Sequence, residues 1–204
     1  MTVPVFKFPK LFFEKNSSLY LTMFENPRNV LVISDDLTLT SAELAVASRF
    51  AARVDGENID VTAVTTTEAN AGKIKSYFDM VIAIGDEDAQ AAAKAYKEGA
   101  ERAVVFIAIP TAPQGSEVYA DVVLADVAFS QDFPAAVTAE NAKVSLAKAE
   151  AVLKSENLND FVEGVAYDAK RALENHMDAA TVLDKEHVLN ASILANIAYA
   201  NTIA

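Results

Sequence analysis

The sequence has 204 residues, of which 52% are hydrophobic, with no cysteine and a formal net charge of −12 at pH 7. The lack of cysteine excludes disulfides and thiolate metal sites, and the acidic balance argues against a nucleic acid or an anionic membrane as partner, because both need a basic face. No apolar run approaches the roughly 18 residues of a membrane span, and the N-terminus lacks the pattern of a signal peptide. We therefore expect a cytoplasmic protein.

The first segment with strand character covers residues 5–13. It alternates imperfectly between apolar and polar side chains and contains four phenylalanines, Phe6, Phe8, Phe12 and Phe13. Proline is tolerated at the edge of a sheet, so Pro9 favours an edge strand. An apolar edge requires a partner, and we expect a homodimer or a larger oligomer.

Three later apolar runs, at 29–36, 79–88 and 103–111, are short, nearly continuous and β-branched. This pattern is typical of strands that are buried on both faces of a parallel sheet. A weaker strand is predicted from Ile59, and a helix is predicted at 88–99.

Another helix is predicted at 41–54, capped by Thr40 or Ser41 and with Glu43 in its first turn. Its buried face is expected to carry apolar residues at helical spacing. These are Leu44, Ala47, Ala51 and Val54.

The amino-acid composition and the spacing of apolar residues change after about Pro134. Segments 135–153, 159–176 and 185–204 are rich in alanine and have a helical period. The terminal stretch 191–204 is almost wholly apolar, so it needs neighbours. The predicted fold class is α/β: a doubly wound, Rossmann-like parallel sheet domain over residues 1–130, followed by a partial all-helical domain over residues 131–204.

The order of these pieces resembles the iron-containing (group III) alcohol dehydrogenase family, which includes glycerol and butanol dehydrogenases. The most specific motif is IAIPTAPQGSEV at 107–118, similar to the family's Ile-Pro-Thr-Thr-Ala-Gly-Thr-Gly-Ser-Glu-Val. FKFPKLFFEK, NVLVISDDL and NASILANIAYAN match other family segments in order. The resemblance implies NAD(P)-dependent alcohol oxidation with iron or zinc. It also implies a cofactor-binding set: Asp35, Gly85, Lys94, Thr111 and Ser116.

The phosphate loop departs from the family. Asp86, Glu87 and Asp88 follow Gly85 where the family has Gly, Gly and Ser. A helix N-terminus binds phosphate through free N–H groups and the helix dipole, whereas a like-charge pair at about 4 Å costs on the order of 4 kcal/mol. Acids in a first helical turn also stabilise a helix without any ligand. We therefore expect the dinucleotide set to be vestigial and no cofactor to bind.

The metal site departs as well. The resemblance places Val144 at the family's Asp ligand and Lys148 at its first His ligand, and neither can bind a metal. The sequence stops at Ala204, before the family's later His ligands, and His176 and His187 are too few to replace three histidines. We expect no metal site. Their spacing of eleven would bring the two histidines together only if one straight helix spanned both, with Asp184 and Glu186 nearby.

Three functions remain open. The first is a degenerate relative of the alcohol dehydrogenases without dehydrogenase activity, with a structural or regulatory role, pairing with itself or with an active paralogue. The second is an NAD(P)-dependent alcohol or polyol oxidoreductase with an altered site. The third is a small-molecule binding domain that uses the carboxyl ends of the strands. The substituted loop and metal positions favour the first.

Overall fold

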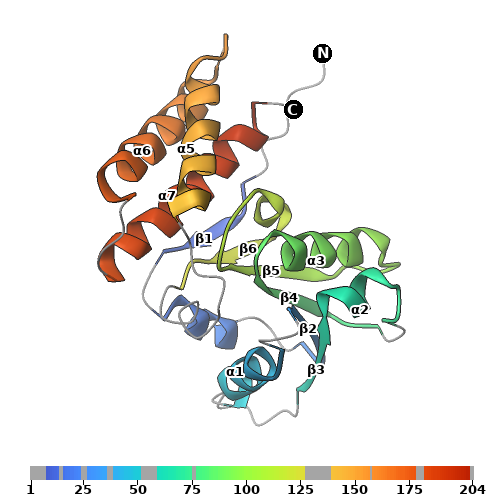
Figure 1. Cartoon of the computed structure of the whole chain (residues 1–204). Coiled ribbons are helices and arrows are strands. Elements are labelled where there is room, and N and C mark those ends of the chain that lie inside the picture. The colour runs from blue at the N-terminus through green and yellow to red at the C-terminus, as the bar shows by residue number, and fades with distance from the viewer. Residues whose placement is uncertain are drawn as a thin grey trace.

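A computed structural model of the chain describes residues 8–13, 16–23, 27–35, 39–51, 59–74, 77–126, 139–156, 158–177 and 182–202. Its strands form one all-parallel, six-stranded sheet flanked by helices, and three long helices pack together beside it (Figure 1). The predicted α/β class is therefore confirmed.

The elements follow the predicted order. The strands are β1 (Lys10–Phe12), β2 (Asn29–Ser34), β3 (Asp60–Thr65), β4 (Met80–Gly85), β5 (Val105–Pro110) and β6 (Val122–Leu124). The helices are α1 (Leu39–Ala51), α2 (Thr66–Asn70), α3 (Glu87–Gly99), α5 (Ala139–Leu153), α6 (Asp160–His176) and α7 (Val182–Ala200), with 3-10 turns η1 (Ser17–Met23) and η2 (Ser116–Tyr119).

The sheet order is β1-β6-β5-β4-β2-β3. Strand β2 is followed by β3 on one side and then by β4 on the other, so the chain reverses its direction of winding around β2. A ligand crevice in such sheets lies outside the carboxyl ends of the strands at this reversal. The segment predicted as an edge strand does lie at the edge, as β1 beside β6; residues 5–7 lie outside the described residues.

Each face of the sheet has its own apolar core. On one face, β2 and β4 pack against α1 through Val46 and Phe50. On the other, the same strands and β5 pack against α3 and α7, and α7 contributes Leu189, Ile193 and Ile197. Burial on both faces explains why β4 and β5 have continuous apolar sequences.

The predicted details of α1 were wrong. The helix begins at Leu39, so Thr40 and Ser41 lie inside its first turn and do not cap it from outside, and Glu43 lies beyond that turn. The predicted inner residue Leu44 is 65% exposed, whereas Ala42, Val46 and Phe50 are buried. Ala42, Val46 and Phe50 are spaced four residues apart. This spacing is as typical of one face of a helix as that of the predicted set, so spacing alone could not identify the buried face.

The final helix is covered by its own chain. Seven apolar residues of α7 between Val188 and Ala198 are buried, either against the sheet or against α5 and α6. The apolar terminal stretch therefore does not need a second chain to cover it, and it ceases to be an argument for an oligomer.

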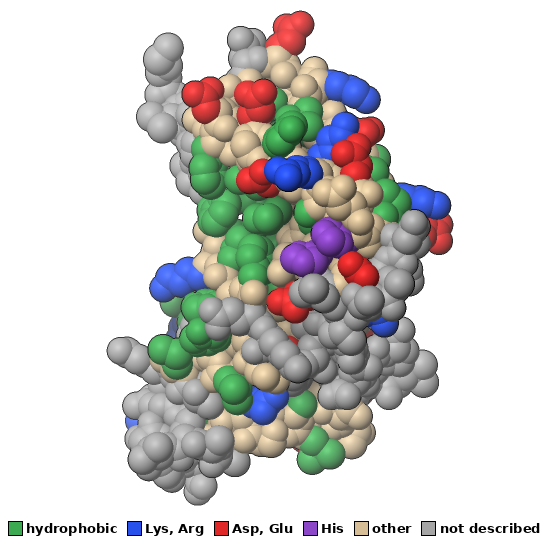
Figure 2. Space-filling model, turned by 90° about the vertical axis from the view of Figure 1, so that its left-hand side faces the viewer, with side chains coloured by type: hydrophobic (Ala, Val, Ile, Leu, Met, Phe, Trp, Pro, Cys, Tyr) green, Lys and Arg blue, Asp and Glu red, His purple; other side chains and the backbone are tan. Residues whose placement is uncertain are grey.

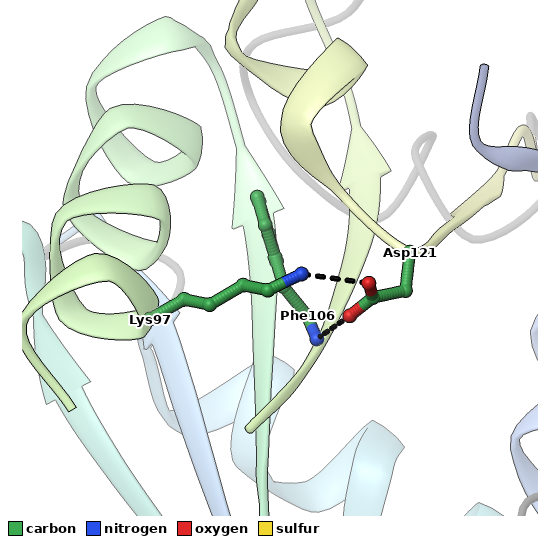
Figure 3. Close-up of polar contacts among 3 residues, drawn as sticks. All are labelled: Lys97, Phe106 and Asp121. Carbon is green, nitrogen blue, oxygen red and sulfur yellow. Dashed lines mark hydrogen bonds and ion pairs between the residues drawn. The ribbon is translucent and has the colours of Figure 1, made fainter. Parts of the chain in front are cut away.

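A polar contact fixes α3 beside the sheet (Figure 3). The Asp121 carboxylate accepts the backbone N–H of Phe106 at 2.7 Å and pairs with the Lys97 ammonium at 2.6 Å. The contact joins α3, β5 and the start of β6. No helix in the described parts of the chain is both long and apolar enough to cross a membrane.

Candidate functional site

A cleft of about 520 Å³ lies where the carboxyl edge of the sheet meets the helices α5 and α7. Its walls come from α3, from the loop around Gly115 and from the two helices, and its polar lining includes two lysines and two tyrosines. The lining residues with ionisable or hydroxyl side chains are Glu87, Lys94, Ser116, Tyr119, Lys148 and Tyr199.

The turn after β4 contains Gly85, one of the predicted cofactor contacts, and the acid that follows it caps the next helix. Gly85 has φ of +148°, a conformation that other residues rarely adopt, and an added Cβ would lie 3.2 Å from that of Ala89. The Asp86 carboxylate accepts the N–H of Asp88 at 3.1 Å as the N-cap of α3. The first acid therefore occupies an N–H group that a phosphate would need.

The second acid reaches across the cleft. Glu87 accepts the backbone N–H of Ser116 at 3.1 Å and its hydroxyl at 2.5 Å. Ser116, one of the predicted cofactor contacts, is therefore bound to a carboxylate of its own chain. A dinucleotide phosphate at this place would displace that contact and meet the negative charge of Glu87.

The other predicted site residues are only partly brought together. Lys94 lies in the cleft, with its ammonium 3.7 Å from the centre of the Tyr119 ring. Thr111, directly after β5, is fully buried, and its backbone N–H donates to the Gly85 carbonyl at 2.8 Å. Asp35, at the carboxyl end of β2, is not among the residues that line the cleft.

Sequence reasoning missed a network that joins the sheet to the helices. Glu117 is fully buried and accepts the N–H of Gly115 at 2.8 Å and the Asn196 amide N–H at 2.7 Å. The Asn196 carbonyl oxygen accepts from the Lys148 ammonium at 2.8 Å, and Lys148 also donates to the Gln114 carbonyl. Asn196 lies 79 residues from Glu117 and 48 from Lys148, so no local pattern in the sequence could indicate the network.

Burial shifts both ionisable ends of this network toward their neutral forms. Desolvation raises the pKa of Glu117, with a further increase from the charge of Glu87, although hydrogen bonds from backbone N–H groups and from Asn196 oppose the shift. Desolvation lowers the pKa of Lys148, against the attraction of the two carboxylates. Burial therefore favours the neutral form both of Lys148, which lines the cleft, and of Glu117, which does not.

Glu117 should make stability depend on pH. Because its pKa is higher in the folded state than its ordinary 4.5, the folded chain binds the proton more tightly, so its contribution is fully present below pH 4.5 and is lost as pH rises through the raised pKa. We expect the free energy of unfolding of the wild type to fall relative to that of Glu117→Gln as the pH increases through the raised pKa of Glu117. Urea unfolding at several pH values measures it, with Glu163→Gln at an exposed position as control. A difference that stays constant with pH would contradict the assignment.

The two residues that the resemblance placed at metal-ligand positions do not fit a metal ion. Val144 has no donor atom and is 44% exposed on α5, and the Lys148 amine binds two carbonyl oxygens as a donor. Among the described residues, no group of three or more His, Cys, Asp or Glu side chains could hold a metal ion.

The two histidines lie together, contrary to the requirement for one straight helix. His176 ends α6 and His187 lies on α7, and packing of the two helices stacks their rings with centres 4.4 Å apart. His176 Nδ1 lies 2.9 Å from the Asp184 carboxylate. Figure 2 shows the histidines at the surface beside acidic side chains, away from the lining of the cleft.

No family model matches the sequence, and no curated protein is significantly similar to it. The fold, however, is found in solved structures. Maleylacetate reductase from Agrobacterium tumefaciens superposes with a TM-score of 0.76 at 19% identity, over 98% of this chain and 66% of that one. An iron-containing alcohol dehydrogenase from Corynebacterium glutamicum gives 0.76 at 15% identity, over 98% and 64%. Sulfoacetaldehyde reductase from Bifidobacterium kashiwanohense, solved with NAD+, gives 0.71 at 18% identity, over 93% and 65%.

The chain therefore has the fold of iron-containing alcohol dehydrogenases and related reductases. It spans slightly less than two thirds of the length of these proteins. At such low identity the likeness concerns the fold, and the chemistry of the cleft has to be argued from its own residues.

Proposed function

We propose that this protein is a degenerate relative of the iron-containing alcohol dehydrogenases that neither binds a dinucleotide nor catalyses metal-assisted dehydrogenation. The contact between Glu87 and Ser116 supports the proposal most directly. It holds a carboxylate near the start of α3, where a dinucleotide phosphate would be expected, and it engages the Ser116 N–H and hydroxyl within the chain. The Lys148 side chain supports it as well, because its N–H groups donate to two carbonyl oxygens of the chain. We assign this chain a structural or regulatory role.

Purified protein should carry no stoichiometric iron or zinc and should show no NAD or NADP binding at micromolar concentration. The physical reasons are the absent donor set at Val144 and Lys148 and the charge of Glu87. Elemental analysis after dialysis and calorimetric titration with each nucleotide measure both properties. Close to one metal per chain, or micromolar nucleotide affinity, would instead support an active oxidoreductase.

We also propose that the chain associates with itself or with an active paralogue through the β1 edge. Phe8, just before β1, is 46% exposed and Phe161 on α6 is 57% exposed, and their rings form a pair with centres 5.6 Å apart. Exposed aromatic rings beside a strand at the edge of the described sheet are characteristic of an interaction surface.

Light scattering at increasing concentration should give a mass above the 21.8 kDa of one chain. Replacing Phe8 and Phe161 together by serine should reduce that mass, whereas replacing the exposed Leu44 on the distant helix α1 by serine should not. A well-folded monomer at high concentration would refute self-association and leave the paralogue as the remaining partner.

A further inference from the structure

The position of Lys148 suggests chemistry that the proposed function does not include. Its amine lies in the cleft beside the Tyr199 ring, 5.8 Å from the ring centre, and two carbonyl oxygens, from Gln114 and Asn196, hold it in place. We propose that the cleft captures a small aldehyde as a covalent Schiff base on Nζ of Lys148.

The surroundings of the amine favour nucleophilic attack. Burial lowers the pKa of Lys148 and so increases the fraction of neutral amine, which is the form that attacks a carbonyl carbon. The charges of Glu117 and Glu87 oppose this shift, but desolvation is the larger effect. Lys143, on the same helix but exposed, has no such enclosure.

The reaction balances without an oxidant or a reductant. The amine nitrogen forms a bond to the aldehyde carbon, and the carbonyl oxygen takes one proton from that nitrogen, which gives a neutral carbinolamine. The oxygen takes a second proton from the solvent and leaves as water as the carbon–nitrogen double bond forms. The protonated imine keeps one N–H, which can donate to the Asn196 oxygen that already accepts from this nitrogen.

The lining of the cleft indicates the class of aldehyde. Its volume of about 520 Å³ admits a short molecule, and the rings of Tyr119 and Tyr199 offer apolar surface. Glu87 contributes a carboxylate to a lining that also contains Lys94 and Lys148, so a strongly anionic compound would meet a charge of its own sign. A short, uncharged aldehyde fits this lining.

The test uses the whole chain and propionaldehyde with sodium cyanoborohydride, which reduces the imine to a stable secondary amine. Mass spectrometry of the intact protein and of its peptides should find one propyl group per chain, located at Lys148. Lys148→Arg keeps the positive charge and should lose this label, while Lys143→Arg should keep it. Circular dichroism shows whether each variant is folded.

A label spread evenly over surface lysines, a label that persists in folded Lys148→Arg, or no label at all would overturn the proposal. If Lys148→Arg does not fold, the rate of labelling in the wild type decides: Lys148 must react before Lys143. This outcome is independent of the proposed lack of dehydrogenase activity, because the labelling requires neither nucleotide nor metal.

Discussion

Replacing Asp86, Glu87 and Asp88 by Gly, Gly and Ser should raise the affinity for NAD by about tenfold or more, which corresponds to 1.4 kcal/mol of binding free energy. The substitution frees the N–H groups at the start of α3 and removes the carboxylate that binds Ser116. The gain should be larger at low salt, because salt screens part of the repulsion in the wild type.

Single variants separate the contributions of these acids. Glu87→Gln should account for most of the gain, since Glu87 lines the cleft, whereas Asp88→Ser, at an exposed position, should have little effect. Replacing the Asp86 cap by Gly should cost only about a few tenths of a kcal/mol of stability, and unfolding is measured alongside binding to check this. An unchanged affinity in the folded triple variant would show that the acids are not what prevents nucleotide binding.

Asn196→Leu should reduce the free energy of unfolding by about 3 kcal/mol, because it leaves two groups without their shared partner. Glu117 loses a donor inside the protein and Lys148 loses an acceptor. Urea denaturation followed by circular dichroism measures the loss.

Ser192→Ala is the matched control for that experiment. Ser192 lies on the same helix and is buried, but its hydroxyl has no hydrogen-bond partner among the described residues. Its removal should leave stability nearly unchanged or slightly higher. In a double-mutant cycle, Lys148→Met should cost less in the Asn196→Leu background than in the wild type. Additive effects would show that the two residues act independently.

The sequence predicted those elements of the fold that a local pattern specifies, and it did not predict features that depend on contacts between distant segments. Strands β4 and β5 were predicted because burial on both faces leaves a continuous apolar run in the sequence itself. Helix α1 was predicted as an element but not in orientation, since Leu44 and Val46 both belong to apolar rows of helical spacing and only packing on the sheet selects between them.

The site was predictable only where one segment carries it. The acids at Asp86 and Glu87 were found because they adjoin Gly85 in the sequence. The role of Asn196, and the stacking of His176 on His187, were not found, because tertiary packing brings those residues together across separate elements. The phosphate-loop acids and the Lys148 position, both read from local segments, are the parts of the site that sequence reasoning reached.

Helix α7 has a consequence for motion. One stripe of it, Leu189, Ile193 and Ile197, belongs to the sheet's core, and another, Val188, Ala191 and Ala195, belongs to the core shared with α5 and α6. A rotation of the three helices away from the sheet would pull α7 out of the first core and expose those large side chains to water, each at about 1.5–3 kcal/mol. Opening the cleft by such a rotation would therefore cost a large free energy. The width of the cleft is set when the chain folds, and a ligand must fit the opening that already exists.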